Sequence, residues 1–274
     1  MKRLIRLESG GQRGQAPDRG MIVLLLSAAA VGIVYFLAQG NEGFLYLLSN
    51  GLPPMLAFVA FMVATAGLIR NGVRLESRVS AVWLGYSVGM LFWFLGELTW
   101  AVYALWYSIP IPYPSIADGF WLAGYIPLLW AIMTKVWPFR EFFSSRKMLI
   151  VLTVVFVLAG LMLVELIPTA FASGQDLLSV AVGLAYPLLD VTLIVVALPI
   201  LFLFGRGTFW RPFLFVVAGL ILTFLGDIMF TWATSNGIYY DGSYLEVFFH
   251  WGYLILAYGF YLRYRRGTGS KMLE

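Results

Sequence analysis

The sequence predicts an all-α integral membrane protein whose eight transmembrane helices form two parallel four-helix repeats. The membrane class follows from composition: 61% of the 274 residues are hydrophobic and 12% are charged, whereas soluble globular domains carry about 25% charged residues. The helix number follows from the apolar stretches and the positive charges, and the repeat follows from a motif that occurs twice. Cysteine is absent, which excludes disulfides, thiolate metal sites and cysteine nucleophiles.

Eight stretches are long and apolar enough to be membrane spans. A helix needs about 20 mostly apolar residues to cross the hydrocarbon core of a bilayer. The predicted spans are approximately 21–39, 52–69, 80–106, 115–136, 147–168, 182–204, 212–234 and 243–263.

The positive charges predict the orientation of these spans. All 18 Lys and Arg residues fall in the terminal segments or around the loops that follow the second, fourth and sixth spans. Cytoplasmic loops are enriched in Lys and Arg. We therefore predict a multi-pass protein of the cytoplasmic (inner) membrane with both termini in the cytoplasm. The positions of the Lys and Arg residues are explained by the orientation of the spans, so the net positive charge does not predict a nucleic-acid partner. Two cytoplasmic tails are predicted. Residues 1–20 form a disordered, basic tail in contact with membrane lipids, and residues 265–274 form the second tail.

One motif occurs twice and defines the repeat. Residues 115–125 and 243–253 share the pattern S-x-x-acid-x-F-aromatic-x-x-G-Y, and a Leu-Gly-acid triplet precedes each copy, ending at Glu97 and Asp227. Units of four spans enter the membrane in the same orientation, so their axis lies along the membrane normal. This argues against an inverted-repeat transporter. The predicted repeats are 21–139 and 140–264.

Ionisable groups inside the predicted spans mark the candidate site. A charge at mid-bilayer costs at least about 2.5–3.5 kcal/mol, so such groups usually face the bundle interior and serve function. The span directions place all of these acids, and the only histidine, in the outer half of the membrane. We therefore expect an outward-facing polar cavity between the two repeats. The predicted ligand-binding or proton-sensing residues are Glu97, Asp190, Asp227, Glu246 and His250, supported by Asp118 and Tyr253.

Structural interpretations of the same residues remain open. Ser115 with Asp118, and Ser243 with Glu246, have the spacing of capping boxes. The other acids within spans can hydrogen-bond between helices, and Glu165 can reach the membrane interface.

His250 and the aromatic residues also have two interpretations. His250 shares a helix face with Glu246 and Tyr253, which predicts either a pH-sensitive pair with the carboxylate or a histidine satisfied within the bundle. Aromatic rings beside acids suit a small cationic or amphipathic ligand through cation–π contacts, or they mark the membrane interface. The aromatic residues at the predicted outer boundary are Trp100, Tyr103, Trp106, Tyr107, Tyr113, Tyr239, Tyr240 and Tyr244.

Several chemistries lack their motifs in this sequence. It contains no Gly-rich phosphate loop and no H-E-x-x-H, and its single histidine is too few for a haem or zinc site. We therefore expect no catalytic residues, no metal and no cofactor, which favours a non-enzymatic role.

The motifs resemble the multi-span N-terminal membrane sensory region of prokaryotic signalling proteins that carry diguanylate cyclase, phosphodiesterase or histidine kinase domains. The resemblance covers most of residues 80–262. It implies a sensory or ligand-binding module; the effector domain of the family is missing here, so the output is expected through a separate signalling protein or a homodimer. The segments that carry it are Leu95–Glu97, Pro114–Tyr125, Tyr186–Val191, Gly226–Asp227 and Ser243–Tyr253.

The sequence thus predicts a multi-pass sensor-type or ligand-binding module with a polar site in the outer half of the bilayer. Two alternatives remain. A small-molecule transporter or permease requires a polar path to the cytoplasm, yet the inner halves of the fourth, sixth and eighth spans are almost wholly apolar. An intramembrane lipid hydrolase is the other alternative, because Gly226-Asp227 and His250 resemble the lysoplasmalogenase type.

Overall fold

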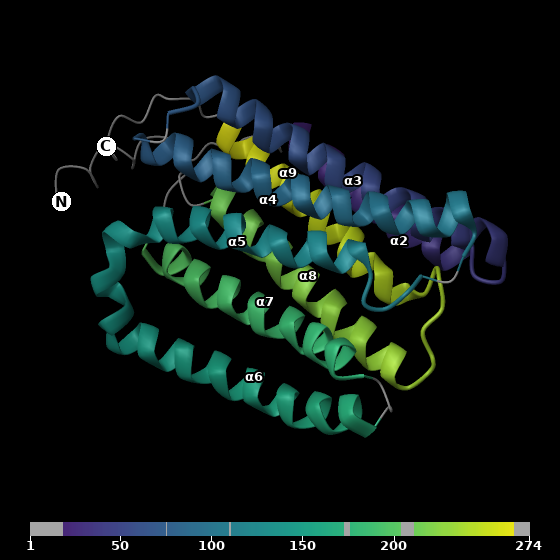
Figure 1. Cartoon of the computed structure of the whole chain (residues 1–274). Coiled ribbons are helices and arrows are strands. Elements are labelled where there is room, and N and C mark those ends of the chain that lie inside the picture. The colour runs from purple at the N-terminus through teal and green to yellow at the C-terminus, as the bar shows by residue number, and fades with distance from the viewer. Residues whose placement is uncertain (1–18, 75, 110, 173–175, 204–210, 266–274) are drawn as a thin grey trace.

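The computed structural model describes residues 19–74, 76–109, 111–172, 176–203 and 211–265. Within these ranges all regular structure is helical, and the long helices lie side by side (Figure 1). The predicted terminal tails fall almost wholly outside the described residues. The elements are α2 (Arg19–Leu37), α3 (Glu42–Asn71), α4 (Arg78–Ala101), η1 (Val102–Tyr107), α5 (Ile116–Val136), η2 (Trp137–Ser144), α6 (Arg146–Ala172), α7 (Leu177–Leu203), α8 (Arg211–Ser235), η3 (Tyr244–Glu246) and α9 (Val247–Arg265).

The helices have the length and composition of membrane spans. In the described part of the chain, seven are long and apolar enough to cross a bilayer: α2, α3, α4 with η1, α5, α7, α8, and η3 with α9. A shorter apolar stretch, Met148–Val157, lies in α6. Many large apolar side chains point outward from the bundle, as on α2, where Leu26 and Phe36 are 65% and 68% exposed. The fold is therefore all-helical and of the multi-pass membrane type.

The second span is longer than predicted. It begins at Glu42 rather than near residue 52, with the Asn41 side chain accepting the Phe44 N–H at 3.2 Å. The predicted start lies near Pro53 and Pro54, but both prolines lie inside α3. Proline is tolerated within membrane helices because neighbouring groups satisfy the freed backbone.

Helices α4 and α9 form the centre of the bundle. Of their most apolar stretches, 61% of the residues are buried, against 11% for α2. α4 packs on α3 and α5, and α9 packs on α8, α3 and α2; α5 also contacts α7, and α6 lies outermost against α7 (Figure 1). Glu97 of α4 and His250 of α9 are thereby directed into the protein rather than toward lipid.

Small residues bring α4 close to α5 and α8 close to α9. A Cβ atom at Gly89 would come within 2.5 Å of Leu128, and one at Gly219 within 2.6 Å of Leu256. Such approaches are possible only for glycine, and they are a common device for packing helices in membranes.

The two ends of the bundle differ in charge. Leu24 of α2 packs with Leu262 of α9, and Tyr35 packs with Val247, so α2 and α9 are antiparallel and Arg19 and Arg265 lie at one end. The helix bounds place the loop 72–77 and η2 at this end, which we call the basic end. The opposite end holds the segments 38–41, 108–115 and 236–243, and we call it the acidic end.

Candidate functional site

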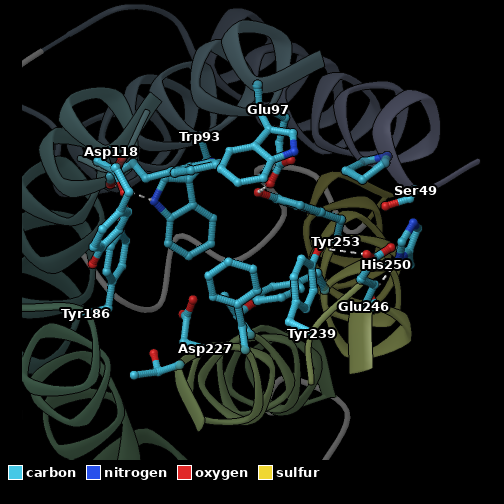
Figure 2. A pocket seen from close by; sticks show the side chains of 18 of the residues that line it. Ser49, Trp93, Glu97, Asp118, Tyr186, Asp227, Tyr239, Glu246, His250 and Tyr253 are labelled. Atoms are coloured by element: carbon cyan, nitrogen blue, oxygen red, sulfur yellow. Dashed lines mark hydrogen bonds between the residues drawn. The ribbon is translucent and has the colours of Figure 1, made fainter. Parts of the chain in front are cut away.

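The acidic half of the bundle encloses a cavity of about 140 Å³ (Figure 2). Six of the seven predicted site residues line it; Asp190 is the exception and lies behind Tyr125, which does line it. The remaining lining residues are mostly aromatic. The described lining comprises Ser49, Pro53, Trp93, Glu97, Trp100, Tyr113, Asp118, Trp121, Tyr125, Tyr186, Thr223, Asp227, Phe230, Thr231, Tyr239, Glu246, Phe249, His250 and Tyr253.

Glu97 joins the two central helices. It lies near the end of α4, and its Oε1 accepts a hydrogen bond from the Tyr253 hydroxyl of α9 at 2.7 Å. The Glu97 side chain is only partly buried, so part of its carboxylate surface faces the cavity. Tyr253 and His250, predicted to share a helix face, both line the cavity, and Tyr253 points to α4.

Asp190 and Asp227 form a carboxyl pair between α7 and α8. Asp190 is 2% exposed, and its Oδ1 accepts from the Tyr125 hydroxyl at 2.7 Å. Its Oδ2 has no other protein partner in the described chain, and the Asp227 carboxyl group lies within hydrogen-bonding range. Two carboxylates are both acceptors, so this contact requires a proton on one of them.

Asp118 forms the predicted capping box. The Ser115 N–H donates to Asp118 Oδ2 at 2.6 Å, and Ser115 Oγ accepts from the Ala117 N–H at 3.2 Å. The other oxygen, Oδ1, accepts from the Tyr186 hydroxyl of α7 at 2.9 Å. Asp118 therefore caps α5 and also fixes a tyrosine in the cavity wall.

Glu246 does not form the predicted capping box with Ser243. The Ser243 N–H donates to the Tyr240 carbonyl, and Ser243 Oγ has no partner among the described residues. The cause is local: Gly242 adopts a φ of 86°, and the chain then enters α9 through the 3₁₀ turn η3. The side chain is thereby displaced from the helix start.

Glu246 instead accepts three hydrogen bonds from around it. Its Oε1 receives the Tyr239 hydroxyl at 2.8 Å and the Gly242 N–H at 2.9 Å, and its Oε2 receives the Tyr35 hydroxyl at 3.0 Å. Burial, followed by the nearby Glu246 carboxylate, raises the pKa of Tyr239, which keeps this hydroxyl protonated as a donor.

His250 is fully buried beside Glu246. Its Nδ1 lies 2.6 Å from the Glu246 backbone carbonyl, so this nitrogen carries a proton, and its Nε2 lies 3.3 Å from the Tyr35 hydroxyl. The direct histidine–carboxylate pair that the sequence allowed is not formed, because Tyr35 lies between the two side chains. Sequence analysis missed Tyr35, which looks like an interfacial tyrosine near the end of an otherwise apolar helix.

The aromatic residues predicted at the outer boundary divide into two groups. Trp100, Tyr113 and Tyr239 line the cavity. Trp106, Tyr107, Tyr240 and Tyr244 are well exposed, at 81%, 60%, 50% and 48%, which is typical of an interfacial position. Tyr113 is also 42% exposed and so belongs to both groups, whereas Tyr103 is partly buried and belongs to neither. Position in the sequence does not separate the two groups, because Trp100 at the end of α4 lines the cavity whereas Trp106 and Tyr107 in the adjoining η1 are exposed.

The cavity wall is rich in hydrogen-bond acceptors and aromatic rings. It contains four acids and no lysine or arginine among its described residues, and the described chain has no cluster of three or more His, Cys, Asp or Glu side chains placed to hold a metal ion. This wall is suited to a ligand that brings hydrogen-bond donors or positive charge. Comparisons with protein-family models, curated proteins and solved structures find no match to the chain, so the function is argued from the site itself.

Proposed function

We propose that this protein is a sensor-type, ligand-binding membrane module whose ligand occupies the cavity at the acidic end. The observation that carries the proposal is the convergence of Glu97, Asp227, Glu246, His250 and Tyr253 on one cavity. Ionisable groups in membrane helices are costly, and they usually mark a site of function.

The proposed topology places this cavity in the outer half of the inner membrane. α6 is taken as the eighth span, with the basic end cytoplasmic. The support is the charge distribution, because described basic residues such as Arg70, Arg78, Arg140 and Arg211 all lie near helix ends or loops at the basic end, as cytoplasmic segments require.

The proposed four-helix repeat is supported by matched contacts. Gly89 against Leu128 in the first half corresponds to Gly219 against Leu256 in the second. The two motif tyrosines also behave alike, since each donates to an acid of the other half: Tyr125 to Asp190 and Tyr253 to Glu97. A site built from such exchanged contacts lies between the halves, where a ligand is able to change their packing.

A transporter is less well supported because the cavity is closed toward the basic end. Between the cavity and that end, Trp83, Tyr86, Met90 and Phe260 are buried in the core. The Tyr86 and Phe260 ring centroids are 4.9 Å apart, and both rings contact Trp83. A transport pathway to the basic end would have to displace these packed side chains, whereas a binding site requires only the cavity.

A hydrolase is also less well supported, because the groups it requires are separated. The acid pair consists of Asp190 and Asp227, while the described hydrogen bonds of His250 go to Tyr35 and the Glu246 carbonyl. A hydrolytic base has to reach an attacking water and be oriented by an acid.

The signal is proposed to pass to a separate signalling protein or through a homodimer, in keeping with the resemblance to membrane sensory regions. A ligand held between α4, α8 and α9 shifts the equilibrium between two packings only if it binds one of them more tightly.

The experiment that tests this function is a thermal-stability screen of small molecules and lipids with the purified protein across pH 5–8. At least one compound should stabilise the parent, and Asp190→Asn with Asp227→Asn should alter that response while the protein stays folded. Glu42→Gln, an exposed acid at the same end, is the control and should respond like the parent. If the double variant and the parent respond identically to every stabilising compound, the site is wrong.

A further inference from the structure

We infer that the ligand of this cavity is a small organic cation, an ammonium group held by aromatic faces between Glu97 and Asp227. The inference rests on the proposed function and names the chemical class of its ligand.

The hydrogen-bond donors of the wall are already committed to the protein. Four lining tyrosines donate to acids: Tyr125 to Asp190, Tyr186 to Asp118, Tyr239 to Glu246 and Tyr253 to Glu97. Two lining indole N–H groups are also engaged, Trp93 with the Trp121 carbonyl at 3.1 Å and Trp100 with Asn50 Oδ1 at 3.0 Å. An anion would therefore find few donors, and it would be repelled by the acids.

Aromatic rings form much of the wall. Trp100 contacts Trp121 at a centroid distance of 5.7 Å and Phe230 at 6.5 Å, and Phe230 contacts Tyr239 at 4.7 Å. Trp93 packs edge-on to Tyr253 with an interplanar angle of 81°. The ring faces carry partial negative charge and attract ammonium groups, most strongly when water is excluded.

Two carboxyl groups of the wall remain open to the cavity. Asp118 and Glu246 are buried and have protein donors on both oxygens. Glu97, beside Tyr253 and Trp121, and Asp227, paired with Asp190, also have protein partners, but both are only partly buried. Figure 2 shows these two at opposite edges of the cavity. They occupy equivalent positions in the two proposed repeats. Because Asp227 shares a proton with Asp190, a cation in the cavity meets the charge of Glu97 on one side and the single negative charge of the Asp190–Asp227 pair on the other.

The same wall does not suit an inorganic cation. Hard metal ions prefer six or more oxygen ligands, and most of the lining here is carbon. The volume of about 140 Å³ is comparable to that of an engineered protein cavity that accommodates benzene, so a compact ammonium is a suitable size.

Choline and its uncharged isostere 3,3-dimethylbutan-1-ol provide the test. The full chain is reconstituted in nanodiscs, and binding is measured by calorimetry and by thermal stabilisation, with sodium, potassium and acetate as further probes. Choline should bind, and the isostere should bind at least about tenfold more weakly because it lacks the charge. Glu97→Gln should weaken choline binding about tenfold or more, and Glu42→Gln should leave it unchanged.

Thr231→Phe provides a second variant that does not touch an acid. Thr231 lines the cavity, so a phenyl group there should exclude choline even if Glu97→Gln fails to fold. Equal binding of choline and its isostere, or binding of choline that Glu97→Gln and Thr231→Phe leave intact, overturns the cation assignment. If a neutral or anionic compound binds and Thr231→Phe abolishes that binding, the cavity is still a ligand site. If no compound binds, the proposed function fails as well.

Discussion

Asp118 and Glu246 occupy the same place in the two copies of one motif, yet the protein uses them differently. Asp118 caps its helix and holds one tyrosine. Glu246 caps nothing and instead accepts from Tyr35, Tyr239 and the Gly242 N–H. Both serines have extended backbone, but Ser115 leads directly into α5, whereas Ser243 follows Gly242 at a φ of 86° and leads into the 3₁₀ turn η3. The role of each acid therefore depends on the backbone that leads into its helix, and the shared motif alone does not determine it.

The outer helices α2 and α6 also differ in the contacts that they make. α2 packs on α9 and brings Tyr35 to Glu246 and His250, whereas α6 packs on α7. The two helices are equivalent in the proposed repeat, but only α2 supplies a described hydrogen bond to a motif acid. The second copy of the motif has thus acquired a polar cluster that the first copy lacks.

Among the variants that compare the two acids, Glu246→Leu is expected to cause the largest loss of stability. The substitution leaves the Tyr35 and Tyr239 hydroxyls and the Gly242 N–H without their acceptor. Each unsatisfied buried group costs about 1–3 kcal/mol, so the free energy of unfolding should fall by about 3 kcal/mol or more. Titration with a denaturing detergent measures the change, and a loss no greater than that of Asp118→Ala would contradict the difference between the two acids.

Asp118→Ala should cost less. Loss of the cap is worth about 1 kcal/mol, and the Tyr186 hydroxyl loses its acceptor in addition, which together give about 2–3 kcal/mol. The same titration checks this value. Equal or greater destabilisation than in Glu246→Leu would show that the capping role dominates.

Tyr35→Phe should remove one hydrogen bond and retain the packing. We expect a loss of about 1 kcal/mol, together with a change in the titration of His250 by NMR, because Nε2 loses its neighbouring hydroxyl. Tyr244→Phe, at an exposed tyrosine of the same end, is the matched control. Identical His250 titration in Tyr35→Phe and the parent would remove Tyr35 from the cluster.

The smallest expected effect is the difference in stability between Ser115→Ala and Ser243→Ala. Ser115→Ala should cost about 1 kcal/mol because it removes an N-cap. Ser243→Ala should not destabilise the protein, since Ser243 Oγ is buried and has no hydrogen-bond partner among the described residues, and burying an unpaired hydroxyl is unfavourable. Equal losses in the two variants would mean that Ser243 does cap α9.

Much of the fold is readable from the sequence because membrane spans depend on length and composition. The all-helical, multi-pass character is confirmed, whereas the start of α3 was wrong because prolines inside a membrane helix look like a boundary. The capping box at Asp118 was predictable from local spacing, since it involves contiguous residues.

The polar cluster was predictable only in part. The predicted depth in the membrane puts Glu97, Asp227 and His250 at one level. Depth does not predict which side chains of distant helices contact these residues. Tyr35 was missed because nothing local distinguishes a buried tyrosine from an interfacial one. Glu246 lines the cavity as predicted, but the alternative interpretation of Glu246 as a capping acid was wrong, since the chain enters α9 through η3 after the turn at Gly242.

The central claim is that the cavity itself binds the ligand, and two threonine variants test it most directly. Thr231 lines the cavity, whereas Thr192 of α7 is exposed on the outside of the bundle. The measurement is the shift in unfolding temperature that a stabilising compound produces in Thr231→Phe and in Thr192→Phe. The account predicts that Thr231→Phe loses the shift and Thr192→Phe keeps it; equal shifts in the two variants would contradict it.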